Sequence, residues 1–181
     1  MAKQIDLRPF EVEIRKWLLQ SVVEFSLNHP DKAVSTLGIH YAGLNPLLTL
    51  GFDAKEHADE VARQDPEEVG EDVGTDEHGR FSRNPHDFDI VETSYGFKGF
   101  PDLYELGSER ILEFTFPDQS TTMVNLDLTG DPGIWKVMFQ FLAPIVENFD
   151  KLNDLNKSAS FRIGLYFMYG DIIHYWYRGN G

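Results

Sequence analysis

The sequence predicts an α+β fold, with a mainly antiparallel β-sheet of hairpins covered by two long helices. Residues 9–28 and 130–154 carry helical apolar patterns. Several short apolar segments occur in pairs, and the turn between the two members of each pair is typical of a hairpin. With 181 residues, 41% of them hydrophobic, the chain can build one core, so we expect a single domain over residues 1–181.

The first helix is predicted over residues 9–28. Pro9 suits the first helical position, and we expect Asp6 just before the cap. Pro30 disfavours helix at His29 and should end it there. One helical face is apolar at i, i+4, i+7 and i+8 spacing. Its residues are Phe10, Ile14, Trp17, Leu18, Val22 and Phe25.

Two short apolar segments, at 34–43 and 46–53, are bounded by Gly or Pro and predict a first hairpin. Residues 54–64 then predict a short polar helix, which Pro66 would terminate. A further strand is expected within residues 88–97.

Residues 110–116 and 121–128 predict a second hairpin, with a turn at 117–120. The alternation should place Ile111, Glu113 and Thr115 on one side of its first strand and the residues between them on the other. The aromatic-rich segment 161–181 predicts a third hairpin, which we expect at the centre of the sheet.

The second helix is predicted over residues 130–154. Asp131 suits its cap and Pro132 its first position. The segment is apolar nearly all round, which predicts burial against the sheet. Pro144 should kink it or split it in two.

The acidic insertion, residues 65–89, has no helical or strand periodicity and is predicted to be a long loop. Charge is concentrated around it. Residues 56–90 carry twelve acidic and three basic side chains, whereas the other 146 residues carry eighteen and thirteen. Such a surface would steer a basic protein partner toward it. The predicted partner contacts are Asp65, Glu67, Glu68, Glu71, Asp72, Asp76 and Glu77.

Composition excludes several other function classes. The net charge of −14 argues against direct binding of nucleic acid, which requires a cationic surface. The absence of cysteine excludes disulfides and thiolate sites. The first residues do not resemble a signal peptide, and no apolar run is long enough to span a membrane, so we expect a cytoplasmic protein without membrane contact.

Metal and cofactor sites are not expected. The insertion contains suitable ligand types, His78 and His86 with neighbouring aspartates, but their spacing matches neither a calcium loop nor a zinc motif. The Gly-containing segments at 95–100 and 129–133 lack the features of a phosphate-binding loop.

Two alternative functions remain open. One is a small hydrolase using strand carboxylates with His86 or His174. Its candidate carboxylates are Glu92, Glu105, Glu113 and Asp127. The other is a structural or assembly module whose acidic insertion becomes ordered on contact with a neighbour. No nucleophile motif supports serine or cysteine catalysis.

The opening third of the chain, about residues 9–65, carries a family resemblance. Its segments FEVEIRKWLLQSVVEFSLNHP, VSTLGIHYAG and PLLTLGFDAKEHADE are similar to the start of a bacterial family grouped with immunity proteins of polymorphic and contact-dependent toxin systems. The resemblance implies a small acidic α+β protein that binds and blocks a cognate toxin, frequently a basic nuclease, inside the producing cell. It implies no catalytic residue and no cofactor. We therefore expect a non-catalytic binding protein.

Overall fold

The computed structural model confirms the α+β class. It describes residues 2–41, 47–61, 63, 74–75, 81–82, 90–96, 99–100, 110–125, 133–149, 152, 155–167 and 173–177, with only the backbone at some positions. The elements in chain order are β1 (Lys3–Asp6), α1 (Arg8–Asn28), β2 (Val34–Tyr41), β3 (Leu47–Ala54), α2 (Lys55–Val61), β4 (Gly74–Thr75), β5 (Phe81–Ser82), β6 (Ile90–Gly96), β7 (Ile111–Thr115), β8 (Thr121–Asn125), α5 (Gly133–Glu147), β9 (Lys157–Phe167) and β10 (Ile173–Tyr177).

The larger sheet has five strands in the order β10-β9-β2-β3-β6. The three predicted hairpins form as antiparallel pairs: β2 with β3, β7 with β8, and β9 with β10. Strand β2 also pairs with β9, and this pairing is parallel, so the sheet is mixed. A second, three-stranded sheet has the order β1-β7-β8, and its β1–β7 pairing is parallel. Strands β4 and β5 form a separate antiparallel pair.

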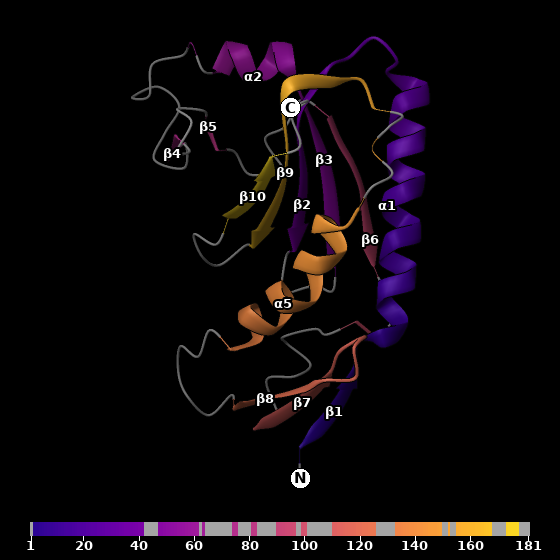
Figure 1. The fold of residues 1–181 in the computed structure, drawn as a ribbon, viewed down its shortest axis with the longest axis vertical. Coiled ribbons are helices and arrows are strands. Elements are labelled where there is room, and N and C mark those ends of the chain that lie inside the picture. The colour runs from indigo at the N-terminus through magenta and orange to yellow at the C-terminus, as the bar shows by residue number, and fades with distance from the viewer. Residues whose placement is uncertain are drawn as a thin grey trace.

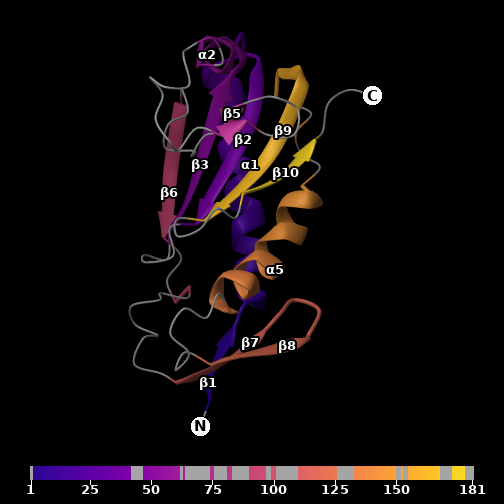
Figure 2. The ribbon, with the colours of Figure 1, turned by 90° about the vertical axis from the view of Figure 1, so that its left-hand side faces the viewer.

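The elements are arranged along one long axis (Figure 1). The five-stranded sheet and α2 occupy one end, and the three-stranded sheet occupies the other, where the N-terminus lies. Helix α5 lies between the two sheets. Figure 2 looks onto the five-stranded sheet, with α1 behind it and β5 in front of it. Helix α1 and the β4–β5 pair are thus on opposite sides of this sheet.

Helix α1 begins at Arg8, one residue before the predicted start, and Asp6 lies just before its N-cap residue Leu7. The Asp6 Oδ1 atom accepts a hydrogen bond from the Arg8 backbone N–H at 3.0 Å, and the Arg8 guanidinium donates to both carboxylate oxygens at 2.8 and 2.7 Å. These hydrogen bonds, led by the one from the side chain of Arg8, lower the pKa of Asp6. A negative charge here also interacts favourably with the helix dipole. At the other end, the His29 N–H bonds to the Phe25 carbonyl.

One continuous cluster of buried apolar side chains joins α1, α5 and both sheets. The predicted face of α1 is buried throughout, and Phe25 stacks on Phe52 of β3 with ring centroids 3.9 Å apart. Phe100 contacts Phe10 of α1, Tyr41 of β2 and Phe141 of α5. These aromatic contacts connect the five-stranded sheet with α1 and α5.

Several expectations about the arrangement need correction. The strands form separate sheets and not the one mainly antiparallel sheet predicted. The two larger sheets are mixed, because β1 and β9 each add a parallel pairing between residues more than 100 positions apart. The C-terminal hairpin lies at an edge, and β2 is the central strand. The second helix spans fifteen residues, a shorter helix than predicted. It continues through Pro144 for less than one turn, and the Asn148 N–H then bonds to the Pro144 carbonyl.

Candidate functional site

The residues predicted to contact a partner lie outside the described part of the chain. They are Asp65, Glu67, Glu68, Glu71, Asp72, Asp76 and Glu77. The same holds for His78, His86, Glu105 and Asp127. Glu92 and His174 fall within β6 and β10, where only the backbone is described. Glu113 lies on the other sheet, where its Oε2 accepts a hydrogen bond from Gln4 Nε2 at 2.6 Å. Glu92 and Glu113 therefore belong to different sheets.

Three neighbouring strands of the five-stranded sheet share a pattern that the sequence interpretation missed. In each strand, a glycine has a polar residue two positions before it and another two positions after it. The nine residues are Thr36, Gly38 and His40 in β2, Thr49, Gly51 and Asp53 in β3, and Arg162, Gly164 and Tyr166 in β9. Because side chains two apart in a strand share a face, each trio lies on one side of the sheet.

The strand register aligns the three trios into rows, which together define the polar face of the sheet. The rows are Arg162–Thr36–Asp53, Gly164–Gly38–Gly51 and Tyr166–His40–Thr49. The residues between them in sequence form the apolar face, which α1 covers. Its rows are Ile163–Leu37–Phe52, Leu165–Ile39–Leu50 and Phe167–Tyr41–Leu48. The six polar side chains are all buried.

A β-bulge at Ser35 makes this arrangement possible. The register of β2 shifts between Val34 and Thr36 against both neighbouring strands. The extra residue allows Val34 to align with buried Ala54 and Thr36 to align with Asp53 on the other face. Ser35 is itself buried, and its hydroxyl donates to the Asp53 carbonyl at 3.0 Å.

Arg162 brings a permanent positive charge into the polar face. Its exposure is only 4%, and its Nε donates to the Thr36 hydroxyl oxygen at 3.1 Å. A buried guanidinium requires hydrogen-bond acceptors, because desolvation of the charge is otherwise very costly. Thr36 supplies one of them from the central strand.

Asp53 and His57 form a carboxylate–histidine pair at the end of the same row. Asp53 is the second-last residue of β3, and α2 starts two residues later, so His57 reaches back over one helical turn. Its Nδ1 lies 2.7 Å from Asp53 Oδ1. The Asp53 side chain is 7% exposed and that of His57 is 28% exposed. A buried carboxylate that orients a partly exposed imidazole is an arrangement suited to proton transfer or to ligand binding.

Gly164 is required by the position of Tyr166. A Cβ atom at residue 164 would lie 2.4 Å from Cε2 of the Tyr166 ring, which is far closer than real contacts. The tyrosine ring therefore lies back over the glycine. Because Tyr166 is buried, its ring has little room to move away.

The polar face, together with His57 of α2 beside it, thus combines a guanidinium, a carboxylate, two imidazoles and hydroxyl groups. Among the residues that the structure describes, no three His, Asp or Glu side chains are placed to hold a metal ion. No described helix is long and apolar enough to cross a membrane. Comparison with protein-family models, with curated proteins and with solved structures found no match to this chain.

Proposed function

We propose that this chain is a single-domain, cytoplasmic, non-catalytic binding protein of the immunity type, which binds and neutralises a cognate basic toxin. The observation that carries the proposal is the concentration of charge in residues 56–90, twelve acidic against three basic side chains. This segment starts within α2 and ends at the first residue of β6, the edge strand of the five-stranded sheet. A strongly anionic surface on a rigid domain accelerates association with a basic partner and contributes specificity.

The described start of the segment is consistent with this proposal. Helix α2 presents Glu56 and Glu60 to solvent. Its Asp59 pairs with Lys55 across one turn. This exposed ion pair contributes little to stability and is screened by salt. Because Lys55 offsets only Asp59, Glu56 and Glu60 keep α2 anionic. The seven predicted contact residues, Asp65 to Glu77, follow directly and would form the core of the partner surface.

The proposal is tested with the protein encoded by the neighbouring gene, by co-purification and by measuring the association rate at low and high salt. We expect a stable complex whose association slows as salt rises. In the test variant, Glu67, Glu68 and Glu71 become Gln and Asp72 becomes Asn. The matched control removes the same number of charges elsewhere, by changing three exposed glutamates to Gln and one exposed aspartate to Asn. These residues are Glu13, Glu24, Glu147 and Asp31.

The test variant should slow association more than the control does. Equal slowing by both variants would show that net charge alone matters, and would contradict a contact at the insertion. Failure of the two proteins to form any complex would contradict the immunity function itself.

The Asp53–His57 pair supports a second candidate, a small hydrolase that uses a strand carboxylate to orient a histidine base. Its test is the hydrolysis of activated esters such as p-nitrophenyl acetate by the wild type and by His57→Gln. A hydrolase predicts a rate well above that of buffer, which the substitution reduces by at least about 100-fold, the usual size of a general-base contribution. Equal rates for the two proteins would exclude this role for His57.

A further inference from the structure

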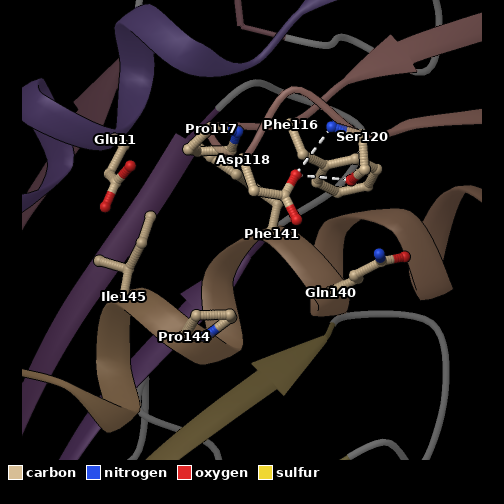
Figure 3. A pocket seen from close by; sticks show the side chains of 9 residues that line it. All are labelled: Glu11, Phe116, Pro117, Asp118, Ser120, Gln140, Phe141, Pro144 and Ile145. Carbon is tan, nitrogen blue, oxygen red and sulfur yellow. Dashed lines mark hydrogen bonds between the residues drawn. The ribbon is translucent and has the colours of Figure 1, made fainter.

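A cavity of about 290 Å³ lies between α1, α5 and the turn that joins β7 to β8 (Figure 3). Its nine lining residues are Glu11, Phe116, Pro117, Asp118, Ser120, Gln140, Phe141, Pro144 and Ile145. This volume is near the lower end of the roughly 300–1,000 Å³ typical of pockets for drug-sized ligands. The cavity therefore fits a small fragment or a single side chain.

The lining combines apolar side chains from α5 and from the turn with one carboxylate from the turn and one from α1. Phe116, Phe141 and Ile145 are buried and contribute their apolar atoms. Figure 3 shows Asp118 directed from the turn toward α5, and Glu11 extending from α1. The lining residues include two carboxylates but neither lysine nor arginine. A ligand with a positive end and an aliphatic body matches both properties.

Asp118 is held in place by its own turn. Its Oδ1 accepts hydrogen bonds from the Ser120 backbone N–H at 2.9 Å and from the Ser120 hydroxyl at 2.6 Å. These bonds, with that from the hydroxyl the largest cause, lower the pKa of Asp118, so the carboxylate is ionised near neutral pH. Within the described residues, its Oδ2 atom accepts no hydrogen bond. Gln119 has a positive φ of 68°, which a non-glycine residue adopts in tight three-residue hairpin turns.

Glu11 contributes less net charge than Asp118. Its Oε1 accepts a hydrogen bond from Arg15 Nε at 2.9 Å, one turn along α1. The Arg15 guanidinium also lies 3.4 Å from the Ile145 carbonyl oxygen. Arg15 therefore offsets the charge of Glu11, whereas Asp118 forms no ion pair with any residue that the structure describes.

We propose that this cavity binds an alkylguanidinium or alkylammonium cation, with its charged group at Asp118 and its aliphatic stem against Phe141 and Ile145. The size and chemistry correspond to an arginine or lysine side chain, or to a free small amine of the same length. The cavity shares no residue with the acidic insertion, so this proposal is independent of the toxin-binding proposal.

The test uses NMR titration of the full-length ¹⁵N-labelled protein with butylguanidinium and butylammonium. We expect shifts centred on the Ser120 and Gln140 amides, with a dissociation constant on the order of millimolar, as is usual for so few ligand atoms. 1-Butanol has the same stem without the charge and should bind at least about threefold more weakly. Equal binding of butanol, or no shift at Ser120 and Gln140, would overturn the proposal.

Asp118→Asn is the discriminating variant. Its side-chain oxygen can still accept both hydrogen bonds from Ser120, so the turn is retained while the charge is lost. Binding of the cations should weaken about threefold to tenfold. Glu13→Gln removes one charge from the exposed face of α1 and is the matched control, which should bind as the wild type does. Equal weakening by both variants would contradict a specific role for Asp118.

The same titration with acetyl-arginine-amide and acetyl-lysine-amide distinguishes the source of the ligand. Binding of these capped amino acids as tight as that of the free cations supports the cavity as a site for side chains of a protein partner. Binding of the free cations alone supports it as a small-amine site.

Discussion

The two faces of the five-stranded sheet are built on the same strands but are stabilised by different means. On the apolar face, side chains fill space against α1, as in the Phe25–Phe52 stack. On the polar face, the buried Arg162 guanidinium needs particular hydrogen-bond acceptors such as Thr36. The Tyr166 ring needs the space that a glycine at residue 164 leaves free. Packing is robust to changes that conserve volume, whereas buried polar groups are sensitive to the loss of a single atom. The apolar face therefore contributes mainly to stability, whereas the polar face holds charged and hydrogen-bonding groups in fixed positions.

The largest expected effect comes from the apolar face. Phe52→Ala removes a fully buried ring that stacks on α1, and should lower the free energy of unfolding by about 3–5 kcal/mol. Urea denaturation of the wild type and the variant measures the difference. The exposed Val12 on α1 provides the control, and Val12→Ala should change stability by less than about 0.5 kcal/mol. A loss below about 1 kcal/mol for Phe52→Ala would mean that α1 is not held on this face by packing.

Gly164→Ala tests the polar face by adding one carbon atom. The new Cβ would clash with the Tyr166 ring, which should cost about 1–3 kcal/mol. The lower entropy of the unfolded chain offsets about 0.4–1 kcal/mol, so the net effect remains destabilising.

Tyr166→Ala identifies the cause of that loss. In a double-mutant cycle, Gly164→Ala should be markedly less destabilising when residue 166 is alanine, with a coupling of about 0.5–3 kcal/mol. Additive losses would show that the clash is absorbed elsewhere.

Thr36→Val tests a single hydrogen bond of the polar face. The substitution keeps the shape of the side chain and removes an acceptor from the buried Arg162 guanidinium, which should cost about 1–3 kcal/mol. Thr121 on β8 is exposed, and Thr121→Val is therefore a matched control with an expected change below about 0.5 kcal/mol. A neutral Thr36→Val would imply that this hydrogen bond does not hold Arg162 in place.

The sequence predicted local structure well and long-range structure poorly. The hairpin of β2 and β3 and the start of α1 just after Asp6 follow from glycine, proline and aspartate signals within a few residues. The parallel pairings of β1 with β7 and of β2 with β9 join segments more than 100 residues apart, which no local pattern specifies. Strand β1 has only four residues, too few for a periodic signal.

The polar face could have been inferred in part. The sequence predicts β2 and β3 from apolar segments bounded by Gly or Pro and β9 from an aromatic-rich hairpin, although each strand contains a glycine with a polar residue two positions away on either side. That shared spacing is a local signal. The alignment of the three glycines into one row, in contrast, depends on the register and on the bulge at Ser35, which only the structure provides. The pairing of Asp53 with His57 across one helical turn was also within reach of local reasoning, because the sequence predicts a helix directly after this strand.

The smallest expected effect lies outside both faces, at the exposed start of α1. Arg8 hydrogen bonds lower the pKa of Asp6 below its usual value of 3.8, so the ionised carboxylate stabilises the folded state. This stabilisation is present above the unfolded-state pKa and is lost as pH falls through the lower folded-state pKa. Asp6→Asn keeps the acceptor for the Arg8 N–H and removes the charge. Urea denaturation should therefore show a small stability difference from the wild type near pH 7, which shrinks as pH falls below about 4.

Arg8→Gln provides the control for this last prediction. It removes the guanidinium that is the main cause of the lowered pKa, so in that background Asp6→Asn should have a smaller effect near pH 7 and a weaker dependence on pH. A difference between wild type and Asp6→Asn that stays constant with pH would show that the negative charge does not stabilise the helix start. The two sheet faces would be unaffected by that result, because their contacts are buried whereas the Asp6–Arg8 pair is exposed to solvent.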